Sequence, residues 1–154
     1  MSLPLIIGQA PARGNDKKPP FAGQSGARLA RLAGVGDSGD DLPAHFELRN
    51  LNTKWPGKRV VGKGDQFDMA EAKLKAKKLK EELMDQRPRF VLLMGRKVER
   101  AFGWHMNYLQ PNTWQGHIVM LFPHPSGVNR WWNDPDNVEH AAAMLKWAVR
   151  GGVG

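Results

Sequence analysis

Residues 117–125 have the sequence HIVMLFPHP, an apolar run that ends at a histidine between two prolines. A short continuous apolar run of this kind is typical of a buried strand in a parallel sheet. Because proline has no N–H group to donate, the strand should end at Phe122. His124 is then expected at the carboxyl end of a strand, where ligands bind in open α/β sheets.

Further apolar runs predict other strands of the same sheet. Residues 3–7 and 90–95 are short and apolar, residues 44–52 have a mixed pattern that favours a strand, and residues 106–109 favour an edge strand. Amphipathic patterns predict helices between them, over residues 26–33, 66–86, 96–102 and 138–150. This alternation predicts a three-layer α/β/α fold with a mostly parallel sheet of about four strands.

Polar residues before the helical patterns predict where the helices begin. Ser25 is a candidate N-cap for the first helix, Asp65 for the long helix, and residues 133–136 for the last helix. The long helix should bury one stripe, formed by Ala72, Ala76, Leu79 and Leu83. Its outer face carries both signs of charge, which favours a solvated crossover helix over a DNA-binding row of lysines.

The composition restricts the class of protein. A chain of 154 residues, 41% of them hydrophobic, predicts a single domain spanning residues 1–154. Its 23 Lys and Arg against 15 Asp and Glu give a net charge of +8, which favours a nucleic-acid partner. With no cysteine, the chain cannot form disulfides, thiolate metal sites or a cysteine nucleophile. We expect a monomer without membrane partner, metal or cofactor, in the cytoplasm of a bacterial cell or phage-infected host.

Three loops follow predicted strand ends and should converge on one crevice, at residues 8–24, 52–59 and 123–133. The first is too long and irregular for a simple connection between two elements. The second contains Lys54, Trp55 and Lys58, which are candidate DNA contacts. An aromatic residue between basic ones suits contact with a phosphate backbone, although an ordinary basic loop has the same composition.

Three of these segments together resemble the signature motifs of the uracil-DNA glycosylase superfamily. They are GQAPA at residues 8–12, PFAGQSG at residues 20–26 and HPSG at residues 124–127. Their order and spacing fit, and the similarity extends over most of the chain, to the small α/β/α members with a Gly-x-Ala-Pro first motif. The resemblance implies a DNA glycosylase that flips out uracil, or a related deaminated or modified base, and hydrolyses its N-glycosidic bond without a lyase step.

The resemblance also implies roles for the two most conspicuous side chains. His124 matches the histidine that donates a hydrogen bond to the departing base, whereas the alternative is a histidine that only caps a turn. Phe21 matches the aromatic residue that stacks on the extruded base. The alternative for Phe21 is an anchor that packs the loop against the core.

Other positions of the family pocket are matched by uncharged residues. Gln9 and the backbone at Ala10 would line the base and water pocket. Asn50 would recognise the Watson–Crick edge of a pyrimidine, because an amide can pair with both a carbonyl oxygen and a ring N–H. Arg49 and Asn52 compete with Asn50 for this role.

The loop after the histidine matches the family segment that enters the duplex beside the flipped base. Its candidate DNA contacts are Ser126, Gly127, Val128, Asn129, Arg130, Trp131 and Trp132. Arg130 could hold a phosphate. Of Trp131 and Trp132, we expect one to act as a wedge in the base stack and the other to anchor the following helix.

The chain departs from the family where acids are common. Many members have Asp or Asn at the position of Ala10, and others have an acid in place of Gln9 or Gln24. Gln24 is expected beside the base, and Asp16 is the nearest carboxylate that could orient water, if it is not a surface turn residue. Several relatives hold an iron–sulfur cluster through cysteines, which this chain lacks.

These departures leave other functions open. The main alternative is a catalytically silent relative that binds DNA or a damaged base as an accessory or sensor protein. An enzyme acting on free nucleotides is a third possibility, but the tryptophan-rich loop argues against it, because a free nucleotide needs no wedge.

Overall fold

The computed structural model describes residues 2–58, 66–126 and 129–153. These residues form one five-stranded sheet in the order β2-β1-β3-β5-β4. The strands are β1 (Leu5–Gly8), β2 (Glu47–Asn50), β3 (Phe90–Met94), β4 (Asn112–Trp114) and β5 (His117–Phe122). The helices are α1 (Gln24–Ala33), α2 (Met69–Met84), α3 (Arg96–Phe102) and α4 (Pro135–Val149), with short 3-10 turns η1 (Gly39–Asp41) and η2 (Arg130–Asn133). The predicted α/β/α fold and mostly parallel sheet are confirmed, and the fifth strand is the antiparallel β4 at the edge.

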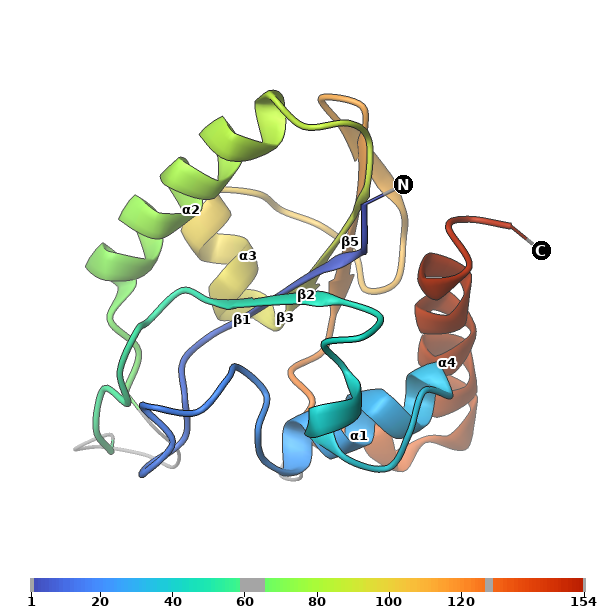
Figure 1. The fold of residues 1–154 in the computed structure, drawn as a ribbon, viewed down its shortest axis with the longest axis horizontal. Coiled ribbons are helices and arrows are strands. Elements are labelled where there is room, and N and C mark those ends of the chain that lie inside the picture. The colour runs from blue at the N-terminus through green and yellow to red at the C-terminus, as the bar shows by residue number, and fades with distance from the viewer. Residues whose placement is uncertain (1, 59–65, 127–128, 154) are drawn as a thin grey trace.

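Helices cover both faces of the sheet, with α2 and α3 on one side and α1 and α4 on the other (Figure 1). Successive side chains of β1 point to opposite faces, as the strand pleat requires. Ile6 packs in the core beneath α1 and α4, whereas Leu5 and Ile7 pack beneath α2 and α3. The central strands are therefore apolar on both faces, which explains their continuous hydrophobic runs.

The long helix α2 has the predicted inner stripe but begins later than expected. Ala72, Ala76, Leu79 and Leu83 are all buried. The helix starts after Asp68, whose side chain accepts a hydrogen bond from the backbone N–H of Glu71 at 3.0 Å. The side chain of Asn52 bonds both the N–H and the carbonyl of Asp68, which fixes the chain in an extended conformation there. The predicted cap, Asp65, lies outside the described residues.

The prediction of an edge strand at residues 106–109 is wrong. Leu109 is buried with a positive φ of 61°, which turns the chain, and Tyr108 makes only an isolated bridge to Leu121. The edge strand is β4, joined to β5 by Gln115 and Gly116, both with positive φ. A two-residue turn with two positive φ values is the preferred connection of a β-hairpin.

The first helix, α1, begins before its predicted start. Gly23 occupies the N-cap position of α1 and makes no side-chain cap, so Ser25 lies inside the helix instead of capping it. The last helix begins within the predicted start signal at residues 133–136 and three residues before the predicted helical range, because Asp134 caps α4 through the N–H of Asp136 and Pro135 is its first residue. On its inner face Ala141, Leu145 and Ala148 are buried, and Met144 is half-buried.

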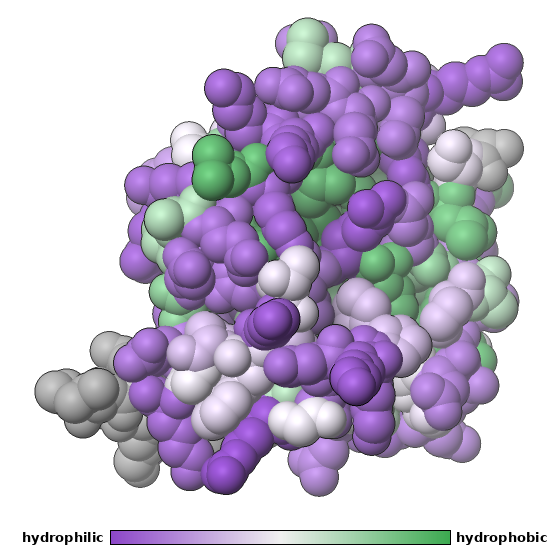
Figure 2. Space-filling view, turned by 60° about the vertical axis from the view of Figure 1, so that its left-hand side comes forward, coloured by the Kyte–Doolittle hydropathy of each residue, from purple (hydrophilic) through white to green (hydrophobic). Residues whose placement is uncertain are grey.

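Hydrophilic residues dominate the face shown in Figure 2, and hydrophobic residues gather there in limited patches. Among the described residues, no helix is both long and apolar enough to span a bilayer.

Candidate active site

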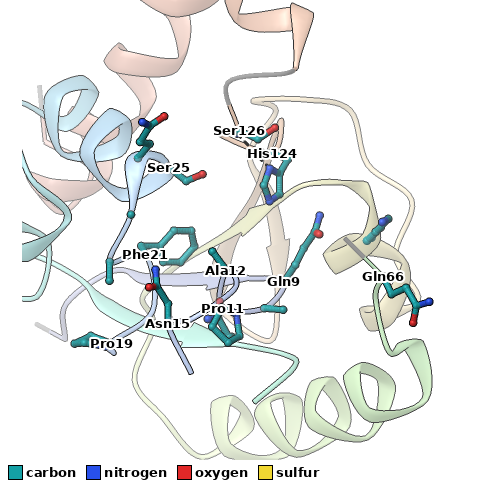
Figure 3. Close-up of a pocket in the computed structure, with 16 residues that line it drawn as sticks. Gln9, Pro11, Ala12, Asn15, Pro19, Phe21, Ser25, Gln66, His124 and Ser126 are labelled. Carbon is teal, nitrogen blue, oxygen red and sulfur yellow. Dashed lines mark hydrogen bonds between the residues drawn. The ribbon is translucent and has the colours of Figure 1, made fainter. Parts of the chain in front are cut away.

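A cavity of about 520 Å³ lies at the carboxyl ends of the parallel strands (Figure 3). Its walls come from the loops after β1 and β5, the start of α1, the end of β2 and the start of α3. The described residues that line it are Gln9, Ala10, Pro11, Ala12, Asn15, Pro19, Phe21, Ala22, Gly23, Gln24, Ser25, Asn50, Gln66, Lys97, His124 and Ser126. Its size is in the range of small-molecule sites, and a nucleobase with its sugar is small enough to enter it.

His124 is held by hydrogen bonds to its backbone and to its ring. The carbonyl of His124 accepts hydrogen bonds from Asn129 Nδ2 at 3.2 Å and from Trp132 Nε1 at 2.9 Å. The ring Nδ1 accepts from the N–H of Ser126 at 3.2 Å. Because Nδ1 is the acceptor, the neutral ring carries its proton on Nε2, which is then free to donate to a ligand.

The surroundings of His124 favour this neutral form. Burial lowers the pKa of His124, and the positive charge of Lys97 lowers that pKa further. The ring can therefore donate an N–H into the cavity at neutral pH without carrying a positive charge.

Gly95 lets the two wall-forming loops approach each other. It follows β3 with a φ of 104°, a conformation that favours glycine. A Cβ atom there would lie 3.2 Å from Gln9 Nε2 and 3.2 Å from His124 Cβ. Gln9, after β1, and His124, after β5, thus lie on either side of the end of β3, and both line the cavity (Figure 3).

Phe21 is positioned by close packing against glycines. Its backbone has a φ of 62°, a conformation that costs a non-glycine residue about 1–3 kcal/mol. Its carbonyl oxygen lies 1.8 Å from where a Cβ of Gly26 would be and 2.1 Å from that of Gly39. Its ring lies over Gly8, where a Cβ would come within 2.5 Å of Cζ. The ring therefore lies at one side of the cavity facing the His124 side (Figure 3), although Phe21 also packs against the core as the alternative reading expected.

The structure separates the three candidates for reading the base. Asn50 pairs with Gly8 in the parallel register and lines the cavity. Asn52 is only 1% exposed, and both ends of its amide are used by the backbone of Asp68. Arg49 is exposed and forms an ion pair with Glu47 at 3.0 Å. Asn50 is therefore the one of the three that the fold brings to the cavity.

Asp16 lies outside the set of residues that line the cavity. Its carboxylate accepts a hydrogen bond from the backbone N–H of Trp55 at 2.9 Å, and its side chain is otherwise exposed. The guanidinium of Arg13 lies 5.6 Å from the centre of the Trp55 ring, so this contact joins the first loop to the second. This position fits the surface-turn alternative, and a role of Asp16 in orienting water stays a prediction.

The basic second loop lies apart from the cavity. Lys54 and Lys58 are exposed and Trp55 is half-buried, and none of them is among the lining residues. Arg59 of this loop falls outside the described residues. Contact of these side chains with DNA stays a prediction.

The two tryptophans after His124 differ in burial. Trp132 is 7% exposed, donates its indole N–H to the carbonyl of His124, and has the Arg28 guanidinium 5.3 Å from its ring centre. Its burial and contacts fit the expected anchor, and contact of Trp132 with DNA stays a prediction. Trp131 is half-buried against Tyr108, and its role as a wedge stays a prediction.

The other predicted DNA contacts of the loop after His124 also differ in where they lie. Ser126 lines the cavity, and Arg130 is exposed. The Asn129 side chain bonds the carbonyl of His124 and the N–H of Trp131, so it holds the loop together. Gly127 and Val128 lie outside the described residues.

Sequence reasoning missed Lys97, Asn15 and Ser25, all of which line the cavity. Of these three residues, Lys97 was the easiest to predict from the sequence, because it comes two residues after the apolar run at residues 90–95. The rule that placed His124 at the end of a parallel strand applies equally to Lys97. Among the described lining residues, Lys97 is the only Lys or Arg, and none is Asp or Glu.

Comparison with known protein families supports the resemblance on which these assignments depend. The family model described as the Uracil DNA glycosylase superfamily matches residues 4–148, which run from just before β1 into α4 and include every lining residue. A search of curated proteins found no match.

Proposed function

The chain belongs to the uracil-DNA glycosylase superfamily, and we propose that it removes uracil, or a related deaminated or modified base, from DNA. Family membership supports a glycosylase-type function and DNA as the partner in general. The observation that carries the proposal is His124, a neutral ring with its Nε2–H free to donate, in a cavity that also contains Phe21 and Asn50.

The proposed reaction breaks the bond between the sugar C1′ and the base nitrogen. The bonding electron pair leaves with the base, which becomes an anion, while positive charge develops on the sugar. His124 Nε2–H donates to the base carbonyl oxygen where this negative charge gathers, and a fixed donor of this kind typically contributes about 10²–10³ in rate. Water then forms the new bond to C1′ and loses a proton, and the base anion gains a proton, so the products are the neutral base and the abasic sugar.

Two side chains give the base its place in the cavity. The Phe21 ring supports stacking, worth about 1–3 kcal/mol per base. The Asn50 amide offers a carbonyl oxygen and an NH₂ group, which complement the ring N–H and carbonyl oxygen on the edge of uracil. The same pair of groups occurs on other oxidised or deaminated bases, so uracil is the first member of a substrate class.

Activation of water is the weakest part of the site. Gln9, the backbone at Ala10 and the nearby Asn15 are uncharged, and the described lining residues include no carboxylate. An amide can orient a water molecule but cannot accept its proton at neutral pH. We therefore propose that the reaction depends on departure of the base more than on attack by water.

Oligonucleotides that carry one uracil test the proposal in single-stranded and duplex form. We expect free uracil together with a strand that breaks only after hot alkali, because a monofunctional enzyme leaves the abasic site intact. Strand scission without alkali would contradict the monofunctional part of the proposal. A panel with hypoxanthine, xanthine and modified pyrimidines then defines the base.

The second candidate function is a silent binder of DNA or damaged bases. The uncharged residues at Gln9, Ala10 and Gln24, where relatives have acids, favour it. Tight binding without release of any base in the panel would establish this function in place of the first. Binding by either candidate should weaken steeply with salt, because phosphate contacts release counterions.

A further inference from the structure

Lys97 brings a positive charge into a cavity that has no negative one among its described lining residues. It is the second residue of α3, and its half-buried side chain lines the cavity with Gln9 and His124. The described residues offer its ammonium group no hydrogen bond or ion pair. A charge left unpaired in such a place should serve a ligand.

The neighbouring cation, Arg96, shows the contrast. Its guanidinium bonds the Glu99 carboxylate at 3.2 Å and the carbonyl of Met106 at 2.6 Å, and it lies 4.4 Å from the ring centre of Tyr108. Arg96 is therefore used to hold α3 and the following segment. Lys97, one residue later, makes no such contact among the described residues and lines the cavity instead.

We propose that Lys97 is a second catalytic residue, whose ammonium group stabilises the negative charge on the base as the N-glycosidic bond breaks. This inference rests on the function proposed above. Lys97 would act from the same side as His124, with His124 donating one hydrogen bond and Lys97 supplying the full charge.

The charges of the transition state support this placement. Negative charge develops on the base and positive charge on the sugar, so a lysine helps only if it lies nearer the base. Lys97 lines the same cavity as His124 and follows Gly95, where a Cβ would lie 3.2 Å from His124 Cβ. In the proposed reaction His124 donates to the departing base, so Lys97 lies on the side of the base. In this partly buried site, water screens the attraction less than at the surface. In the proposed mechanism Lys97 therefore stabilises the base anion, whereas a carboxylate would stabilise the sugar cation.

The competing role for Lys97 is contact with a DNA phosphate. Exposed basic residues outside the cavity, such as Lys54 and Lys58, are better placed for that role. The two roles predict different results, because a phosphate contact strengthens binding of every DNA equally, whereas stabilisation of a leaving base matters most for a poor leaving group.

The experiment compares release of uracil and 5-fluorouracil in a single turnover, with DNA affinity measured separately. Fluorine makes the departing base a weaker base and so a better leaving group. We expect Lys97→Met to lower the rate about 10²-fold with uracil, to lower it much less with 5-fluorouracil, and to leave DNA affinity unchanged. Lys97→Arg, which keeps the charge, should recover most of the rate. Lys73→Met, on the exposed face of α2, removes the same charge elsewhere and should match the parent protein.

Two results would overturn the inference while leaving the proposed function intact. One is an unchanged uracil rate in Lys97→Met, and the other is an equal loss for both bases together with weaker DNA binding. If the parent protein itself releases neither base, the proposed function fails, and the role of Lys97 fails with it. Equal melting temperatures of the Lys97 variants and the parent establish that the differences do not arise from unfolding.

Discussion

The two walls of the cavity are held in place by different physical means. The His124 wall is a set of hydrogen bonds, in which the ring and carbonyl of His124 are bonded by Ser126, Asn129 and Trp132. The Phe21 wall is a set of close packing contacts, in which three glycines leave room for one aromatic residue in a left-handed conformation. The first arrangement sets a tautomer and a charge state, and the second sets a shape. Damage to the first should therefore affect the chemical step, and damage to the second should affect recognition of the base.

The largest effect is expected from His124→Ala, which removes the donor from the hydrogen-bonded wall. Turnover of uracil should fall about 10²–10³-fold, while DNA affinity changes little. Single-turnover kinetics and fluorescence anisotropy measure the two quantities. His140→Ala, at an exposed position of α4, is the matched control. Equal rates for His124→Ala and the parent would show that the chemistry does not use this histidine.

Gly26→Ala should disrupt the close packing that holds the Phe21 wall in place. The new Cβ would lie 1.8 Å from the carbonyl oxygen of Phe21, so the loop or the helix must move. Overpacking of this kind typically lowers the free energy of unfolding by about 1–3 kcal/mol, which denaturant titration measures. Gly23→Ser is the control, because a Cβ at Gly23 would make only an ordinary contact of 3.9 Å with Asn15 Nδ2, and serine is a favoured N-cap. If Gly26→Ala were as stable as the parent, close packing would not hold Phe21.

Phe21→Ala removes the ring but leaves the wall's backbone. Loss of one stacking contact should weaken binding of uracil-containing DNA by about 1–3 kcal/mol and leave binding of normal DNA unchanged. The comparison is best made in a His124→Ala background, where the base is not released during the titration. An equal loss for both DNAs would mean that Phe21 acts as a loop anchor alone.

The pH dependence of turnover tests the charge state of the hydrogen-bonded wall. The active ring is neutral, so activity should fall as pH decreases through the pKa of His124, which burial and the Lys97 charge lower from its ordinary value. Lys97→Met removes the second cause, and the acid limb of the profile should then move to higher pH. Two other cations lie on or near this loop among the described residues, Arg28, bonded to the carbonyl of Ser126, and the exposed Arg130, and both are unchanged in this variant. If the acid limb did not move in Lys97→Met, the charge of Lys97 would not influence the pKa of His124.

The smallest effect is expected at Asp16, which belongs to neither wall. Asn in its place can still accept the hydrogen bond from the N–H of Trp55, so Asp16→Asn should turn over uracil at the parent rate. The assay is the single-turnover measurement used for His124→Ala. A large loss of rate would return Asp16 to the candidates for orienting water.

Local sequence patterns were sufficient to predict much of the fold and the position of His124 in its wall of the cavity. The apolar runs at residues 90–95 and 117–122 specify strands because a central strand is apolar on both faces. The two prolines end β5 and place His124 at the strand end. The inner stripe of α2 follows directly from helical periodicity.

Features that depend on contacts between distant residues could not be predicted in this way. Asn50 and Asn52 are equivalent in the sequence, and only the register of β2 beside β1 and the bonds from Asn52 to Asp68 separate them. The same bonds displace the start of α2. Gly8 and Gly26 were visible as motif residues and Gly39 was not, and the role of Gly26 and Gly39 appears only when both meet the carbonyl of Phe21.

The most direct test of the account is the amount of free uracil released in one turnover by the parent protein, His124→Ala and Phe21→Ala, each at saturating protein. The proposed mechanism predicts release by the parent, near loss of release in His124→Ala despite normal DNA binding, and release by Phe21→Ala once higher concentrations compensate for weaker binding. No release by the parent, or equal release by all three proteins, would contradict the assignment of this cavity as a glycosylase site.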